Sequence, residues 1–106
     1  MAERRRPDET PELRRLRKRI DALDRRIVAM LNDRAQLARE AGRAKSAAGR
    51  RTVRDAERER EVLLRVSMAN EGPLPQAELL ALYRRLFAAT RALETRDRAK
   101  PADEGH

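Results

Sequence analysis

The sequence has 106 residues, a net charge of +8 and 42% charged residues, with two aromatic residues and no cysteine. This length allows one small domain with a modest core, and the composition is typical of long helices or coiled coils. The absence of cysteine argues against disulfides and thiolate nucleophiles, and the single histidine, at the last position, argues against histidine catalysis and zinc binding. We therefore predict no metal and no cofactor.

The N-terminal segment lacks an apolar stretch of signal-peptide length, and the longest aliphatic runs, such as IVAML, are too short to cross a bilayer. We expect a cytoplasmic protein with no membrane partner. Its positive excess lies in the middle of the chain, which indicates an anionic ligand or nucleic acid as partner. Residues 1–12 and 96–106 are predicted to be disordered tails around one domain at residues 13–95.

The first predicted element is a long helix from Leu13 to about Lys45. It has no proline and one glycine, and its apolar residues form a heptad-like stripe: Leu13, Leu16, Ile20, Leu23, Ile27, Met30, Leu37 and Ala41. A helix of about 33 residues is about 50 Å long, which exceeds what two shorter helices of the same chain can cover. The stripe therefore predicts pairing with a second copy, as an intertwined homodimer.

Arg34 takes the heptad position of Ile20 and Ile27, in the middle of this stripe. Leaving a charge unpaired among apolar neighbours is costly, so we expect an anionic partner for Arg34, although an arginine in the stripe can also specify the register of the pair. Arg17 and Lys45 flank the stripe. For these two residues, structural salt bridges are the simpler interpretation.

A basic loop at residues 46–54 precedes a second predicted helix, which Asp55 can cap. Asp55 and Glu59 lie four residues apart on the face that Val62 continues, with Arg58 beside them, so both carboxylates are predicted to point inward. Taken alone, such a pair is more often a solvated first turn that the helix dipole favours.

The third predicted helix follows EGPLP at residues 71–75 and runs from about Pro75 to Thr95. Thr90 and Glu94 lie four residues apart and continue its apolar face. The sequence thus predicts an all-α chain of one long and two shorter helices, each with polar residues in its inward face. One buried polar site shared by the three helices explains this pattern with fewer assumptions than a separate cause of polar burial in each helix.

Such a site offers guanidinium and ammonium groups for carboxylates and acidic groups for a hydroxyl, without a histidine or cysteine for base or nucleophilic chemistry. This inventory suits binding of a small dianion and stabilisation of a polar transition state by placed charges.

Three segments occur in order along the chain: LRKRIDALDRRIVAMLNDRAQLAREAGRAK, VRDAERERE and LYRRLFAATRALE. Together they resemble the all-helical chorismate mutase family (type II), over roughly residues 13–95. The resemblance implies an isomerase of aromatic amino acid biosynthesis, in which three-helix chains interlock as homodimers and convert chorismate to prephenate by an intramolecular Claisen rearrangement.

The resemblance also implies roles for the charged residues of the long helix. Arg17 and Arg34 would clamp the substrate carboxylates, and Lys45 would contact a carboxylate and the ether oxygen. Arg17 and Arg34 are about 25 Å apart along one helix, too far to hold one small ligand together. The resemblance resolves this distance, because it implies that Arg17 comes from the other protomer and that each dimer has two composite sites.

On the other two helices, the resemblance implies that Asp55 and Glu59 hold the ring hydroxyl region and that Arg58 supports the site. Thr90 and Glu94 would fill polar positions against the substrate. Protonated Glu94 would donate a hydrogen bond to the ether oxygen, so we expect the highest activity on the acidic side. Arg34, Lys45 and Glu94 would then be the catalytic residues.

Other activities stay open. An isochorismate-pyruvate lyase or an aminodeoxychorismate mutase could use the same fold, and a basic helical dimer could bind nucleic acid through phosphate contacts. The near absence of aromatic residues argues against nucleic acid as the partner. An enzyme of the aromatic pathway is a further possible partner.

Overall fold

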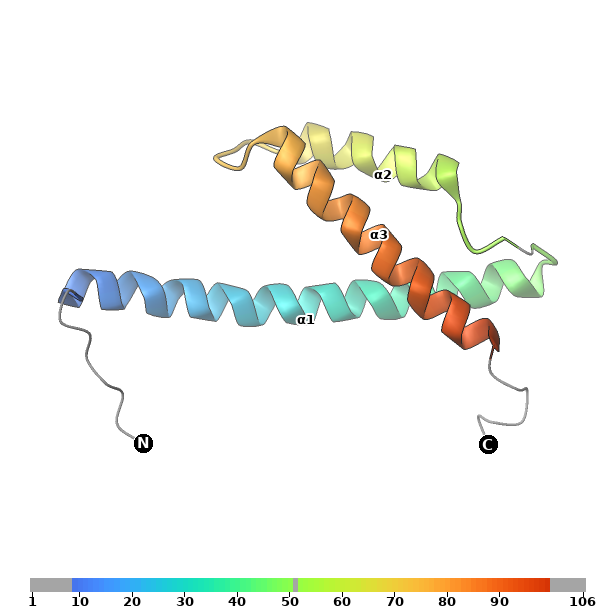
Figure 1. Ribbon diagram of the computed structural model, residues 1–106, viewed down its shortest axis with the longest axis horizontal. Helices are drawn as coiled ribbons and strands as arrows, with labels where there is room; N and C mark the ends of the chain where they lie inside the picture. The colour runs from blue at the N-terminus through green and yellow to red at the C-terminus, as the bar shows by residue number, and fades with distance from the viewer. Residues whose placement is uncertain (1–8, 51, 100–106) are drawn as a thin grey trace. The chain divides into compact units, whose positions relative to one another are not determined.

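The computed structural model describes residues 9–50 and 52–99. Within these ranges the regular elements are three helices, α1 (Pro11–Ala47), α2 (Ala56–Ala69) and α3 (Gln76–Ala99) (Figure 1). The prediction of an all-α fold with one long and two shorter helices is confirmed. The chain divides into two compact units: the first ends at Arg34, within α1, and the second begins at Ala35.

The start of α1 is fixed by a side-chain cap. The Thr10 hydroxyl oxygen accepts a hydrogen bond from the backbone N–H of Leu13 at 3.1 Å. Pro11 follows in the first helical position, where the missing N–H costs nothing because no carbonyl within the helix would pair with it. The helix therefore begins slightly before the predicted Leu13.

The end of α1 is fixed by a glycine. Gly49 has a φ of +85°, a conformation that is strained for residues with a side chain. Its N–H donates to the carbonyl of Ser46 at 3.0 Å, and the N–H of Arg50 donates to the carbonyl of Lys45 at 2.9 Å. This pair of bonds is the Schellman arrangement, which satisfies carbonyls that the helix end would otherwise leave without donors.

The apolar stripe of α1 is exposed to solvent in the single chain. Ile20 is 54% exposed, Ile27 48% and Leu37 66%. Leu16, Leu23 and Met30 belong to the same exposed set. The described single chain therefore leaves most of the predicted stripe uncovered.

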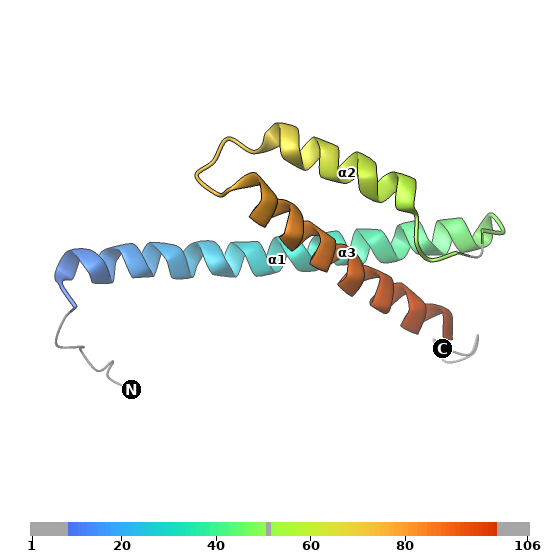
Figure 2. The same cartoon turned by 45° about the horizontal axis from the view of Figure 1, so that its top comes forward.

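In the second unit, α2 and α3 lie side by side and run in opposite directions (Figures 1 and 2). The N–H of Leu79 donates to the carbonyl of Pro75 at 3.1 Å, which starts α3 directly after the predicted break. The rings of Tyr83 and Phe87 pack edge to face with centroids 6.2 Å apart. Phe87 is only 6% exposed and is the buried apolar residue of this small core.

The helices extend beyond both ends of the domain that the sequence predicts at residues 13–95. Residues 1–8 and 100–106, in the predicted tails, lie outside the described residues. The described parts of those tails include helix at both ends, since α1 begins at Pro11 and α3 continues past Thr95 to Ala99. Among the described residues, no helix is long and apolar enough to span a membrane.

Candidate active site

Glu94 on α3 is the most buried carboxyl group among the described residues, with 8% of the residue exposed. It reaches α1 at Gly42, which is buried and has no side chain in the way. A Cβ atom built on Gly42 would lie 2.9 Å from Glu94 Oε1. Close approach of the Glu94 carboxyl group to α1 therefore depends on glycine at position 42.

Lys45 provides the nearest cation for this carboxylate. Its Nζ lies 3.8 Å from Glu94 Oε1, and the side chains of Lys45 and Glu94 are 19% and 10% exposed. Lys45 Nζ also donates to the carbonyl of Val53 at 3.3 Å. Within the described residues, Glu94 Oε1 accepts no hydrogen bond. At 3.8 Å the contact between Lys45 and Glu94 is an ion pair and not a hydrogen bond.

Thr90 lies one turn before Glu94 and is 7% exposed. Its hydroxyl donates to the carbonyl of Leu86 in its own helix at 2.8 Å. The hydroxyl proton is therefore already used, and the oxygen is left as an acceptor.

Asp55 is the N-cap of α2, as predicted. Its Oδ1 accepts a hydrogen bond from the backbone N–H of Arg58 at 3.0 Å. This bond lowers the pKa of Asp55 and outweighs the effect of burial, and the charges of Arg50 and Lys45 lower it further. The carboxylate thus caps its own helix, and its other oxygen lies 3.6 Å from the guanidinium group of Arg50.

Glu59 does lie on the inner side of α2. Its side chain is 16% exposed and pairs with Arg91 on α3 through a short contact, and Arg54 lies 3.5 Å from its other oxygen. Neither partner was indicated by the sequence pattern. The guanidinium groups of Arg54 and Arg91 thus both pair with the Glu59 carboxylate.

The other predicted site residues are Arg58 in the second unit and Arg17 and Arg34 in the first. The Arg58 side chain pairs with Glu61 along α2 at 3.3 Å and is half-exposed. Arg17, in the first unit, forms an ion pair with Glu9, just before α1 of the same chain. Arg34, in the same unit, is half-buried.

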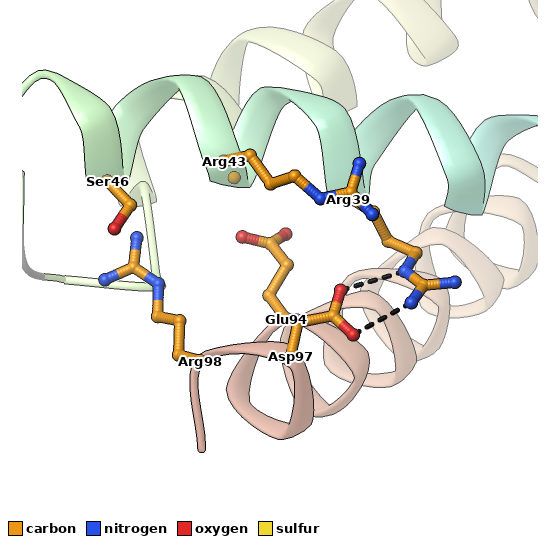
Figure 3. Close-up of a pocket in the computed structure, with 7 residues that line it drawn as sticks. Arg39, Arg43, Ser46, Glu94, Asp97 and Arg98 are labelled. Carbon is orange, nitrogen blue, oxygen red and sulfur yellow. Dashed lines mark hydrogen bonds and ion pairs between the residues drawn. The ribbon is translucent and has the colours of Figure 1, made fainter. Parts of the chain in front are cut away.

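An ion pair that no sequence pattern indicates joins α1 to α3. Arg39 donates two hydrogen bonds to Asp97, at 2.8 and 2.9 Å (Figure 3). Both side chains are partly buried, 29% and 19% exposed. The hydrogen bond from Arg39 to Asp97 and the charge of that carboxylate raise the pKa of Arg39 above its ordinary value.

A pocket of about 170 Å³ lies beside this pair, between α1 and α3. Of the predicted site residues, only Glu94 contributes to its wall (Figure 3). The pocket is lined by Arg39, Gly42, Arg43, Ser46, Glu94, Asp97 and Arg98.

Of the predicted site residues, the described structure joins Lys45 to Glu94, which lies one turn after Thr90, and places Asp55 and Glu59 at the start of α2. Within the described ranges, no group of three or more His, Cys, Asp or Glu side chains could hold a metal ion. The arrangement can bind a polar ligand and place charges around it.

Comparison with known proteins identifies this class of protein. The family model of chorismate mutase type II matches residues 16–95. The chain belongs to this family.

Two curated relatives are similar to this chain in sequence. The bifunctional chorismate mutase/prephenate dehydratase of Aquifex aeolicus is 39% identical over 87 residues, which are 78% of this chain and 24% of that protein. The protein of the same name from Stutzerimonas stutzeri is 37% identical over 90 residues, 81% of this chain and 25% of that protein. The chain spans about a quarter of the length of these curated relatives.

A solved structure matches over nearly its whole length. Chorismate mutase (form II) from Thermus thermophilus has a TM-score of 0.76 to this chain and 33% sequence identity. The match covers 80% of this chain and 96% of that chain. The three-helix architecture is therefore that of a chorismate mutase.

Proposed function

We propose that this protein is a chorismate mutase, which converts chorismate to prephenate for aromatic amino acid biosynthesis. The observation that carries the proposal is the partly buried contact between Lys45 and Glu94, 3.8 Å apart, within the region that matches the family. Lys45 and Glu94 come from different helices, and Glu94 Oε1 accepts no hydrogen bond within the described residues. A charged pair of this kind, drawn from two helices, supplies polar groups that a polar ligand can use.

The proposed reaction suits these side chains. In the rearrangement, the ether C–O bond breaks and a C–C bond forms within one molecule, so no proton or leaving group has to be taken up by the protein. Catalysis then depends on holding a near-attack conformer and on stabilising negative charge that develops on the ether oxygen. Lys45 and protonated Glu94 are proposed to donate hydrogen bonds to that oxygen.

The remaining roles follow the family resemblance. Arg34 of one chain and Arg17 of the partner subunit are proposed to bind the two carboxylates of the substrate. Arg34 is also proposed to act in catalysis. Asp55 and Glu59 are proposed to bind the ring hydroxyl region. Thr90 is proposed to line the substrate site beside Glu94, and Arg58 is proposed to support the site.

The exposed stripe of α1 supports an intertwined homodimer with two composite sites. Burial of one large aliphatic side chain contributes about 1.5–3 kcal/mol, so a row of such residues left half in water favours association. A second copy of the chain offers a stripe of the same period. Such pairing is also what would bring an Arg17 from one chain to the site of the other.

The first experiment is to incubate the purified protein with chorismate, follow the loss of chorismate absorbance and identify the product. Prephenate is the expected product. Release of pyruvate from isochorismate would favour the lyase instead, and turnover of aminodeoxychorismate alone would favour that mutase. No turnover of any of these compounds, together with salt-sensitive binding to duplex DNA, would favour the nucleic-acid alternative.

The second experiment tests the composite site. Arg17→Ala and Arg34→Ala proteins are each expected to be inactive as homodimers. In a mixed dimer, one of the two sites receives both arginines from intact chains, so mixing should restore part of the activity. No recovery after verified subunit exchange would argue that each site is built within one chain.

The names of the curated relatives suggest a partner. In those proteins chorismate mutase is combined with prephenate dehydratase. We propose that prephenate made here passes to an enzyme that acts on it, in the cytoplasm.

A further inference from the structure

Glu94 has a geometric requirement that the family assignment does not explain. Its carboxyl group occupies the space in which any residue other than glycine at position 42 would place a Cβ atom. The separation from that position, 2.9 Å to Glu94 Oε1 and 3.2 Å to Glu94 Cδ, is too short for an ordinary contact. The same oxygen lies 3.8 Å from Lys45 Nζ. Gly42 and Lys45 are three residues apart on α1, so the Glu94 carboxyl group packs against one face of this helix.

A second contact holds the same turn of α3. Asp97 lies one turn after Glu94, and Arg39 lies one turn before Gly42, so the Arg39–Asp97 pair is next to the Gly42–Glu94 contact (Figure 3). A two-bond contact between a planar guanidinium and a carboxylate fixes orientation as well as distance. It joins the end of α3 to α1 directly beside Glu94.

From these two contacts we infer that Gly42, Arg39 and Asp97 are positioning residues, which hold the Glu94 carboxyl group beside Lys45. This inference rests on the proposed function, since it gives that carboxyl group its role. None of the three residues has to touch the substrate. Gly42 leaves space for the carboxyl group on α1. The Arg39–Asp97 pair holds α3 close enough to α1 for the Glu94 side chain to fill this space.

The sharpest test is Gly42→Ala. The added methyl group meets the flexible end of a side chain rather than backbone, and alanine is the better helix former, so the chain is expected to keep its fold. The methyl group should instead displace the Glu94 carboxyl group. A misplacement of about 1 Å in a catalytic group can cost about 100-fold in rate, so we expect kcat to fall by about this factor while KM changes little.

Ser46→Ala is the matched control for Gly42→Ala. It introduces alanine one turn further along α1, in the wall of the same pocket, where no described hydrogen bond or ion pair joins Ser46 to Glu94. It should leave kcat unchanged. A Gly42→Ala protein with normal kcat would overturn the inference.

The Glu94→Ala background tests whether Gly42 acts through Glu94. If it does, adding Gly42→Ala to Glu94→Ala should change kcat little further, because the group being positioned is already absent. An equal loss in both backgrounds would overturn the inference, since Gly42 would then act by another route.

The ion pair is tested by exchange of its partners. Arg39→Leu should lower kcat more than KM changes, and the exchanged pair Arg39→Asp with Asp97→Arg should recover much of the loss. Arg43→Gln removes a positive charge from the same pocket and serves as the control for charge alone. Equal effects of Arg39→Leu and Arg43→Gln, or no recovery in a folded exchanged protein, would overturn the role of the pair.

A structural measurement separates this inference from the proposed function. Absence of chorismate turnover by the unmodified protein would refute the function alone. In that case, a crystal structure of the Gly42→Ala protein still tests the positioning role. The Glu94 carboxyl group should move away from its place against Gly42 and Lys45, and an unmoved carboxyl group would overturn the inference.

Discussion

Replacement of Ile27 by aspartate is expected to dissociate the proposed dimer. Ile27 is 48% exposed in the single chain and lies in the middle of the apolar stripe of α1. Full burial of an isoleucine contributes about 2 kcal/mol, so about half of this gain is still available to a partner. Aspartate loses that gain and must also lose water from its carboxylate, which costs several kcal/mol when no cation is near.

We estimate a loss of about 3 kcal/mol per chain from these two effects. A twofold dimer contains the substitution twice, so the loss is about 6 kcal/mol, or about 10⁴-fold in the dissociation constant. Sedimentation equilibrium over a range of concentrations measures this change. Circular dichroism shows whether the separated chains stay helical.

Asn32→Asp is the matched control for Ile27→Asp. It introduces the same side chain and the same change in charge five residues further along α1, where the native residue is polar and exposed. Its dissociation constant should stay close to that of the unmodified protein. A dimer that is equally stable with aspartate at position 27, or an unmodified protein that is monomeric at high concentration, would refute the assignment of the stripe as an interface.

Three further predictions concern the site. Arg34→Ala should keep the dimer and lower kcat/KM by about 100-fold or more, because loss of a hydrogen bond to a charged group costs about 3 kcal/mol; near-normal kinetics would contradict its role. Asp55 has a pKa below its ordinary value because it accepts the Arg58 N–H bond, so its contribution to stability is present above the ordinary carboxyl pKa and is lost as pH falls through the lowered one. Urea unfolding of Asp55→Asn should therefore depend less on acidic pH than unfolding of the native chain, and equal pH dependence would contradict this. Glu94→Gln should retain activity, since an amide can donate the hydrogen bond that Glu94 is proposed to give to the ether oxygen; loss of activity in a folded protein would contradict that role.

Local sequence signals were sufficient to predict the helices. A capping residue, a glycine and a proline mark helix ends through the backbone of a few neighbouring residues, and apolar periodicity marks the elements between them. Asp55 is the N-cap of α2, and α3 starts at Gln76, just after the predicted break. These features require no knowledge of distant parts of the chain.

The end of α3 could not be predicted in this way. Residues 96–99 look like the beginning of a charged tail, yet they are helical. Two contacts with distant residues accompany this extra turn: Asp97 pairs with Arg39, and Arg98 donates to the carbonyl of Arg50 at 3.4 Å. Tertiary contacts of this kind override a weak local preference.

The partners of the site carboxylates were hidden for the same reason. Glu59 and Arg91 are 32 residues apart, and Arg39 and Asp97 are 58 residues apart, without any local pattern that relates them. Sequence spacing correctly placed Thr90 and Glu94 on one buried face. It could not indicate that Gly42 leaves the space that Glu94 fills, because that space exists only where α3 meets α1.

The C-terminal part of α1 uses two sides of the helix for two purposes. Arg39 and Gly42 contact α3, whereas Leu37 is 66% exposed although it lies only two residues before Arg39. Two residues correspond to roughly 200° around a helix, so contact with α3 on one side leaves the other side open. Leu37 continues the stripe that contains Ile27, and that stripe therefore stays available to a second copy even where α1 already carries α3. Dissociation of the dimer by aspartate at position 27 should accordingly leave the Arg39–Asp97 pair intact within each chain.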